Sequence, residues 1–120
     1  QLLEAIQRCP DVLRIYHQKG RIQVPRNQNR LYGLLEDCVV GVLPKGADSS
    51  FHPKVWVLRW TNDAGEVRYR VLCLSRNLGF ARSWDTVLAL DGKLVPNRGG
   101  AIARNRGLVD FVRARPRRSR

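Results

Sequence analysis

Methionine is absent from this 120-residue chain. Since translation starts at methionine, we expect either that residues were removed from the start or that the chain is a fragment of a longer protein. No apolar run approaches the roughly 18 residues that a membrane helix needs. The N-terminus also lacks the basic and then apolar pattern of an export signal. At this length the chain is one domain, or a piece of one, and is long enough for a single core.

Cysteine is scarce, odd in number and widely spaced, at Cys9, Cys38 and Cys73. There is no CxxC pair and no metal-ligand spacing, so the sequence predicts no disulfide framework, no metal site and no other cofactor. Each cysteine lies in or next to an apolar stretch. This placement is typical of buried free thiols in a reducing compartment, and it favours a cytoplasmic protein.

Acidic residues are also few: 10 against 22 basic ones, for a net charge of +12. An excess of this size favours a polyanionic partner, with nucleic acid first and anionic lipid second. The charge is uneven, because residues 98–120 hold eight arginines and a single acid, Asp110. These terminal arginines can either grip phosphates or form a solvated linker, and the sequence does not decide between the two.

Helix and strand patterns mix along the chain. We expect helices at residues 2–8, 30–37 and 108–114, and strands at 12–16, 21–24, 38–43, 51–60, 66–74 and 84–90. Pro10 should end the first helix and Asn29 should cap the second. Asn62-Asp63-Ala64-Gly65 predicts a hairpin turn. The result is an α/β or α+β sandwich around a mixed sheet.

Residues 96–107 are rich in Gly, Arg and Asn and predict a linker. We therefore expect a domain over residues 1–95, followed by a basic linker with one short helix and a disordered tail over 96–120.

Two short patterns carry chemistry: His52-Pro53-Lys54 opens one expected strand and Ser75-Arg76-Asn77 follows the next. Neighbouring antiparallel strands would bring an imidazole, an ammonium, a hydroxyl and an amide together. A neutral imidazole can attack phosphorus, while Lys54 and Asn77 hold the non-bridging oxygens. Ser75 can assist or can fix the loop. Asp85 can accept from the second imidazole nitrogen and select its tautomer.

These residues resemble the HKD motif of the phospholipase D superfamily, which runs His-x-Lys, a gap, Gly-Ser-x-Asn and a later acid. The resemblance covers residues 38–92, and the matching positions are His52, Lys54, Ser75, Asn77 and Asp85. There are two departures. Arg59 stands where the family has an Asp, and Leu74 stands where it has a Gly. The tyrosyl-DNA phosphodiesterase branch also lacks that Asp.

The resemblance implies a phospholipase D-like mixed β-sheet sandwiched by helices. It also implies a metal-independent phosphodiesterase or nuclease that works through a phosphohistidine. Such a site uses two HKD motifs, with the second His as general acid. His17-Gln18-Lys19 is formally another His-x-Lys, but no Ser-x-Asn follows it. The second half-site must then come from a second copy of the chain or from a missing segment.

Two other functions remain open: a non-catalytic module that binds nucleic acid with half a site, and a phospholipid-directed member of the superfamily. The lack of an amphipathic membrane segment argues against the second. The expected partner is nucleic acid, with DNA as the expected kind, and no membrane is expected. Four arginines near the motif in sequence are candidates for holding the phosphate backbone of the nucleic acid: Arg68, Arg70, Arg76 and Arg82.

The three tryptophans could stack on bases or pack in the core. Trp56 lies in the middle of an expected strand, where core packing is favoured. Trp60 and Trp84 lie nearer strand ends, and both interpretations stay open for them.

Overall fold

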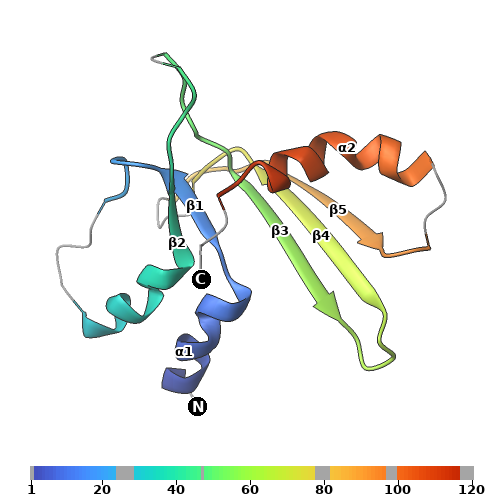
Figure 1. Ribbon diagram of the computed structural model, residues 1–120, viewed down its shortest axis with the longest axis horizontal. Coiled ribbons are helices and arrows are strands. Elements are labelled where there is room, and N and C mark those ends of the chain that lie inside the picture. The colour runs from blue at the N-terminus through green and yellow to red at the C-terminus, as the bar shows by residue number, and fades with distance from the viewer. Residues whose placement is uncertain (1, 24–28, 47, 78–81, 97–99, 117–120) are drawn as a thin grey trace. The chain divides into compact units, whose positions relative to one another are not determined.

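The computed structural model describes residues 2–23, 29–46, 48–77, 82–96 and 100–116 (Figure 1). The chain divides into two compact units. The first comprises Gln1–His52 with Gly107–Arg120, and the second comprises Pro53–Arg106. The domain boundary predicted after residue 95 stays a prediction. Each unit is described by itself below.

The first unit begins with α1, Leu2–Val12, which is longer than predicted because Pro10 does not end it. Pro10 lies in the last turn, where a missing N–H removes a single backbone hydrogen bond. The helix closes with the Leu13 N–H donating to the Cys9 carbonyl at 2.8 Å.

Two short strands pair in parallel in this unit, β1 (Ile15–Gln18) and β2 (Val39–Val42), with Ile15 opposite Val39. Both fall within or close to strands that the sequence predicted. Residues 21–23 are not a strand, so that prediction is wrong for them, and Val24 lies outside the described residues.

Between these strands lies η1, a 3-10 helix over Arg30–Cys38. Asn29 caps it as predicted, because its side chain accepts a hydrogen bond from the Leu31 N–H at 3.0 Å. Cys38 at the end of η1 is 0% exposed and Val42 in β2 is 8% exposed. In the part of the chain that the structure describes, these two apolar side chains form the buried centre of the first unit.

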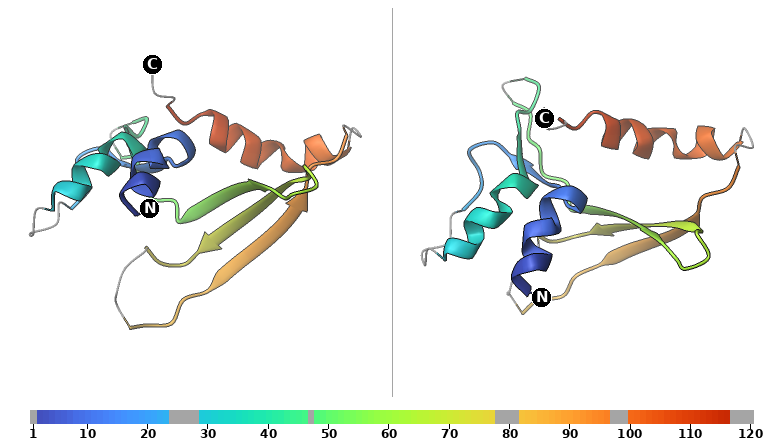
Figure 2. Two further views of the ribbon diagram at one scale, coloured as in Figure 1. Left: turned by 90° about the horizontal axis from the view of Figure 1, so that it is seen from below. Right: turned by 60° about the horizontal axis from the view of Figure 1, so that its bottom comes forward.

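The second unit is a three-stranded antiparallel sheet in the order β3-β4-β5, made of Val55–Thr61, Val67–Leu74 and Val87–Lys93 (Figure 2). Val55 pairs with Cys73, and Cys73 pairs with Leu88. The mixture of helices and strands agrees with the predicted fold class. The single mixed sheet does not form among the described strands, because the parallel and antiparallel pairs lie in separate sheets.

The turn between β3 and β4 is the hairpin turn that the sequence predicted. Gly65 donates its N–H to the Asn62 carbonyl at 2.9 Å and has a φ of +75°. The Asn62 side chain accepts from the Glu66 N–H at 2.8 Å. Glycine is favoured at such a position because a Cβ strains the left-handed backbone.

Helix α2, Gly100–Arg113, occupies most of the predicted linker, so the prediction of a linker is wrong from residue 100 onward. The composition of this stretch obscured a segment of good helix formers between its glycines. Within the helix, the Asn105 side chain donates a hydrogen bond to the Ala101 carbonyl one turn earlier, at 2.9 Å. The expected disorder of the last five residues concerns a segment that lies mostly outside the described residues.

Arg115, just after α2, contacts Phe51 and Phe111, two aromatic residues of the first unit. Its guanidinium lies 4.9 Å from the ring centroid of Phe51 and 4.7 Å from that of Phe111. Its Nε donates to the Phe111 carbonyl at 3.0 Å. Phe51 is also held by its backbone, whose N–H donates to the Gln18 side chain at 2.9 Å. Stacking on two aromatic faces suits a planar guanidinium.

Replacing Gly65 with Ala should lower the free energy of unfolding by about 1–2 kcal/mol, because alanine is strained in the left-handed region. Gly92→Ala is the matched control. A Cβ meets nothing within 4 Å at either glycine, and only Gly65 has a positive φ. The control should be neutral or slightly stabilising. Urea unfolding of both variants checks this, and equal losses would contradict it.

Candidate functional site

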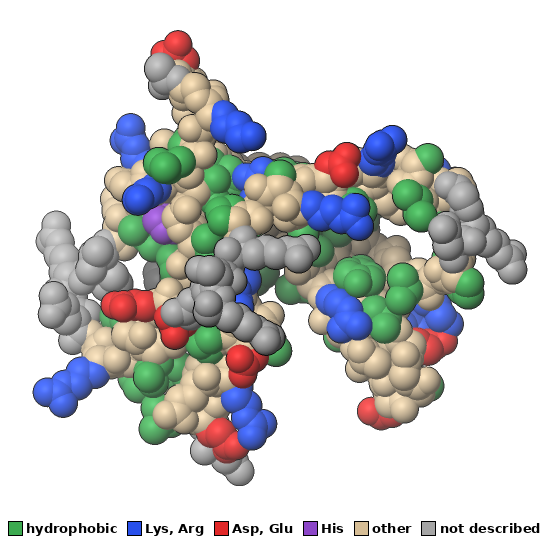
Figure 3. All heavy atoms as spheres, viewed as in Figure 1, with side chains coloured by type: hydrophobic (Ala, Val, Ile, Leu, Met, Phe, Trp, Pro, Cys, Tyr) green, Lys and Arg blue, Asp and Glu red, His purple; other side chains and the backbone are tan. Residues whose placement is uncertain are grey.

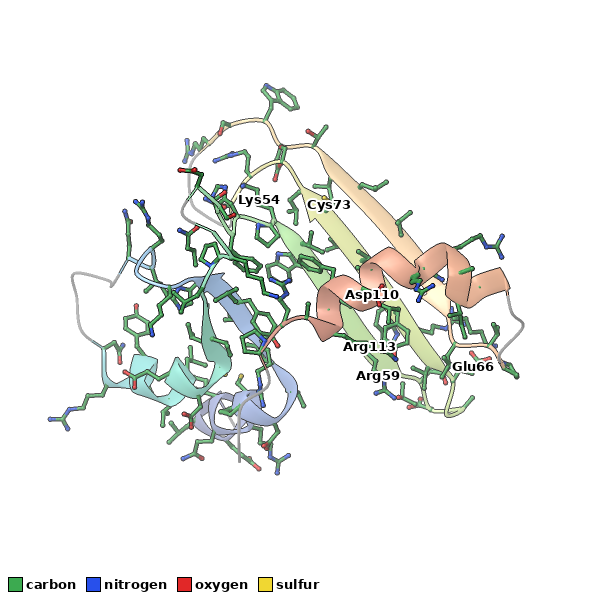
Figure 4. All side chains as sticks on the ribbon, turned by 45° about the horizontal axis from the view of Figure 1, so that its top comes forward. Lys54, Arg59, Glu66, Cys73, Asp110 and Arg113 are labelled. Atoms are coloured by element: carbon green, nitrogen blue, oxygen red, sulfur yellow. The ribbon has the colours of Figure 1, made fainter. Side chains whose placement is uncertain are left out.

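Three strand ends meet at one end of the three-stranded sheet. The Leu74 N–H donates to the Lys54 carbonyl at 2.9 Å, and the Ser75 N–H donates to the Thr86 carbonyl at 3.0 Å. Figure 4 shows Lys54 and Cys73 at this end and Glu66 at the opposite, hairpin end. The pairing of β3, β4 and β5 therefore brings together the backbones of Lys54, Ser75 and Asp85. We call this place the sheet-end cluster: Lys54, Ser75, Arg76, Asn77 and Asp85.

Ser75 and Asp85 bind one another within this cluster. The Asp85 Oδ1 atom accepts from the Ser75 N–H at 3.1 Å and from the Ser75 hydroxyl. The same hydroxyl oxygen accepts from the Thr86 N–H at 3.1 Å. Of the two roles considered for Ser75, these contacts match loop fixation, because the hydroxyl proton is used inside the protein.

The surroundings of Asp85 stabilise its charged form. The hydrogen bond from the Ser75 hydroxyl is the main cause that lowers the pKa of this carboxyl, and the backbone N–H groups of Ser75 and Thr86 and the charge of Arg76 add to it. Asp85 thus has a structural role at the base of the loop. Orienting the imidazole of His52, the role predicted for it from the sequence, stays a prediction.

The loop between β4 and β5 carries two of the four predicted nucleic-acid contacts, Arg76 and Arg82. Arg76 is half-buried and donates from Nη1 to the Ser83 carbonyl at 2.8 Å. Arg82 and Asn77 are exposed. These side chains therefore lie on or beside the loop that Ser75 and Asp85 close.

The two members of the His-x-Lys pattern fall on either side of the boundary between the units. His52 is exposed and is the last residue of the first segment of unit one, whereas the half-buried Lys54 belongs to unit two. Only Pro53 separates them, so their Cα atoms lie at most about 7 Å apart. His17 lies in β1, half-buried, with Nδ1 2.8 Å from the Gln18 carbonyl. That position is consistent with an ordinary strand histidine.

Arg68 and Arg70 are not near the sheet-end cluster. They precede Ser75 by seven and five residues along β4, which corresponds to about 23 and 17 Å. Arg70 makes a two-pronged ion pair with Asp91, at 2.7 and 2.9 Å, and Arg68 pairs with Glu66 at 3.2 Å. Arg68 and Arg70 are thus near the motif in sequence but distant from the sheet-end cluster along β4. That they hold a nucleic-acid backbone stays a prediction.

Glu66 forms ion pairs with Arg68 and Lys93 at the hairpin end of the sheet. Hydrogen bonds from Lys93, Arg68 and Asn62 lower the pKa of this carboxyl to about 2. Basic side chains elsewhere are scattered over the face that Figure 3 shows and do not form one continuous patch there.

The tryptophans are more exposed than core packing requires. Trp56 is 40% exposed, so the prediction that it lies in the core is wrong, and Trp60 is exposed to the same degree. Arg70 lies over the Trp60 ring, 6.0 Å from its centroid. Trp84 is 99% exposed and lies in the loop between β4 and β5.

All three cysteines are free thiols, but only Cys38 is buried; Cys9 is intermediate and Cys73 is exposed. Burial raises the pKa of the Cys38 thiol, and the neighbouring Cys9 adds to the shift while Arg14 opposes it. Among the described residues, no three His, Cys, Asp or Glu side chains gather as metal ligands would. Neither described α-helix is long and apolar enough to cross a membrane.

Comparison with known proteins finds no match among protein-family models, curated proteins or solved structures. The resemblance to the phospholipase D superfamily therefore rests on the residues of the motif alone.

Replacing Asp85 with Asn should lower stability at neutral pH and flatten its loss in acid. The pKa of Asp85 is lowered in the folded state, so its contribution is complete above the ordinary value of 3.8 and is lost as the pH falls through the folded-state pKa. The midpoint of urea unfolding, measured from pH 7 down to pH 2, checks this. Asp63→Asn, a charge-matched change in the hairpin turn, should keep the wild-type acid limb. An unchanged acid limb in Asp85→Asn would contradict the role of this carboxylate.

Proposed function

We propose that this chain supplies one half of a phosphodiesterase site of the phospholipase D kind, and that its substrate is nucleic acid. The observation that carries the proposal is the pairing of Lys54 with Leu74, which sets the lysine beside the Ser75-Arg76-Asn77 segment. His52 lies two residues before Lys54 in the sequence. The order and types of these residues are those that an attack on a phosphodiester needs.

In the proposed reaction the neutral imidazole of His52 attacks phosphorus and forms an N–P bond while the bond to the leaving oxygen breaks. Lys54 and Asn77 hold the non-bridging oxygens, where negative charge gathers. Water then cleaves the N–P bond and releases the phosphate product. The proton that the leaving oxygen needs comes from a second histidine. That histidine belongs to a second copy of the chain or to a segment outside it.

Charge favours nucleic acid as the substrate. The chain has a net charge of +12, and Arg76 and Arg82 lie on either side of Asn77 in the sequence. Contacts from arginine to the phosphate backbone supply affinity that depends steeply on salt.

A second candidate is a module that binds nucleic acid without cleaving it. The observation that favours it is the state of Ser75, whose hydroxyl is hydrogen-bonded to Asp85 and so does not donate to a phosphate in this arrangement. Binding to DNA that falls steeply with salt, with no phosphodiester cleaved, would support this candidate over the enzyme.

His52→Ala should reduce cleavage of bis(p-nitrophenyl) phosphate and of labelled single-stranded DNA by a factor on the order of 10³ or more, because no other group replaces the nucleophile. His17→Ala, the matched control, removes the only other histidine. It should keep the rate, and its circular dichroism should match that of the wild type. The assay covers a range of protein concentrations, because a site shared by two copies gains activity as they associate. A wild-type rate in His52→Ala would overturn the proposal.

Chelation should leave turnover unchanged, since Lys54 and Asn77 carry out the charge stabilisation that a metal ion supplies in other phosphodiesterases. The rate is measured in EDTA and again with magnesium restored. Acid-labile, alkali-stable labelling of the protein by a phosphate-labelled substrate would identify the phosphohistidine. A strict need for a divalent ion would contradict this chemistry.

A further inference from the structure

Trp84 is placed unlike an ordinary tryptophan. Its side chain is 99% exposed, whereas tryptophans in folded proteins are on average highly buried. It lies directly before Asp85, one of the residues of the sheet-end cluster. A fully exposed indole at this position can serve as a contact surface for a ligand.

The backbone on both sides of Trp84 is held against the end of β4. On one side, Arg76 donates to the Ser83 carbonyl at 2.8 Å. On the other, Asp85 accepts from the N–H and the hydroxyl of Ser75. The indole is thus exposed while its backbone is fixed, and such preorganisation lowers the cost of binding.

The charges beside Trp84 identify the chemistry of the ligand. Arg76 and Arg82 belong to the same loop, and Lys54 lies at the same end of the sheet. Asp85, the single acid between Ser75 and Thr86 in the sequence, is engaged by Ser75 and lies close to the charge of Arg76. A flat apolar ring next to positive charge suits a ligand that carries a planar base on an anionic backbone.

We propose that Trp84 is a base-stacking residue for single-stranded nucleic acid. A nucleobase stacks on the indole while the neighbouring phosphate lies by Lys54 and Asn77, a position that rests on the function proposed above. Single strands fit because their bases are available for stacking, whereas those of a duplex are already stacked and paired. Trp60 is the natural comparison, since its ring already has Arg70 beside it and it lies at the other end of β3.

The test compares two ligands of equal length and charge: a labelled oligothymidine and the same strand without bases. Binding is measured by fluorescence anisotropy in a His52→Ala background, so that no strand is cut. With Trp84 present, the strand with bases should bind about 5- to 150-fold more tightly than the abasic one, the range measured for one stacked base. Trp84→Ala should abolish this preference, whereas Trp84→Phe should retain most of it. The exposure of the side chain predicts an unchanged fold, which circular dichroism checks.

Trp60→Ala is the matched control and should keep the preference for the strand with bases. Equal binding of the two strands by the tryptophan-containing protein, or a preference that survives Trp84→Ala, would overturn the inference. Trp84-dependent binding to phosphatidylserine vesicles that oligothymidine does not displace would also overturn it, in favour of a lipid surface. Base preference that depends on Trp84 would support stacking even if the protein with His52 cleaved no phosphodiester. In that case only the proposed catalysis would fail.

Discussion

The backbone hydrogen bond from Leu74 to the Lys54 carbonyl is the contact on which the candidate site depends. It exists only in one register of β3 against β4. A slip of one residue would pair Leu74 with another residue, and it would turn every side chain of the slipped strand to the opposite face. That register is set at the far end of the hairpin, where the positive φ of Gly65 and the Asn62 hydrogen bonds close the turn. A turn seven residue pairs away therefore decides which side chains meet at the sheet-end cluster.

Ser75 and Asp85 show how a residue of a chemical motif can be required for shape. Their hydrogen bonds close the loop between β4 and β5, and Arg76 supports the same loop through the Ser83 carbonyl. The hydrogen bonds from Ser75 stabilise the ionised carboxylate of Asp85, and the ionised carboxylate in turn accepts those hydrogen bonds more strongly than a protonated one would. The local consequence is that Ser83 and Asp85 are held at the end of β4, while Trp84 between them is exposed to solvent.

Local signals in the sequence were sufficient for the hairpin turn, the Asn29 cap and the antiparallel return of β4, since each depends on residues close together in the chain. Other features depend on pairing between distant residues or on the balance within a segment. The separation into two sheets follows from such pairing. So do the hydrogen bonds between Ser75 and Asp85, which are ten residues apart in the sequence. Helix α2 was missed because its Gly and Asn residues suggested a linker, although the residues between them favour a helix. The arginines of β4 are near the motif in sequence, but an extended strand separates successive residues by about 3.3 Å, so nearness in sequence does not give nearness in space.

Some of the excess arginines make contacts within the fold. Arg70 and Arg68 pair with acids on the sheet, and Arg115 stacks between two phenylalanines. Those uses do not exhaust the excess, because 22 basic residues face only 10 acidic ones. Even if every acid took one basic partner, a charge of +12 would remain to act on a polyanion at a distance of about one Debye length, roughly 8–10 Å at moderate salt. In the function proposed above, the attraction to nucleic acid is therefore a property of the whole chain, whereas discrimination between kinds of strand requires a local contact. The stacking proposed for Trp84 would supply that local contact, and Lys54 and Asn77, which are proposed to bind phosphate, belong to the same unit as Trp84.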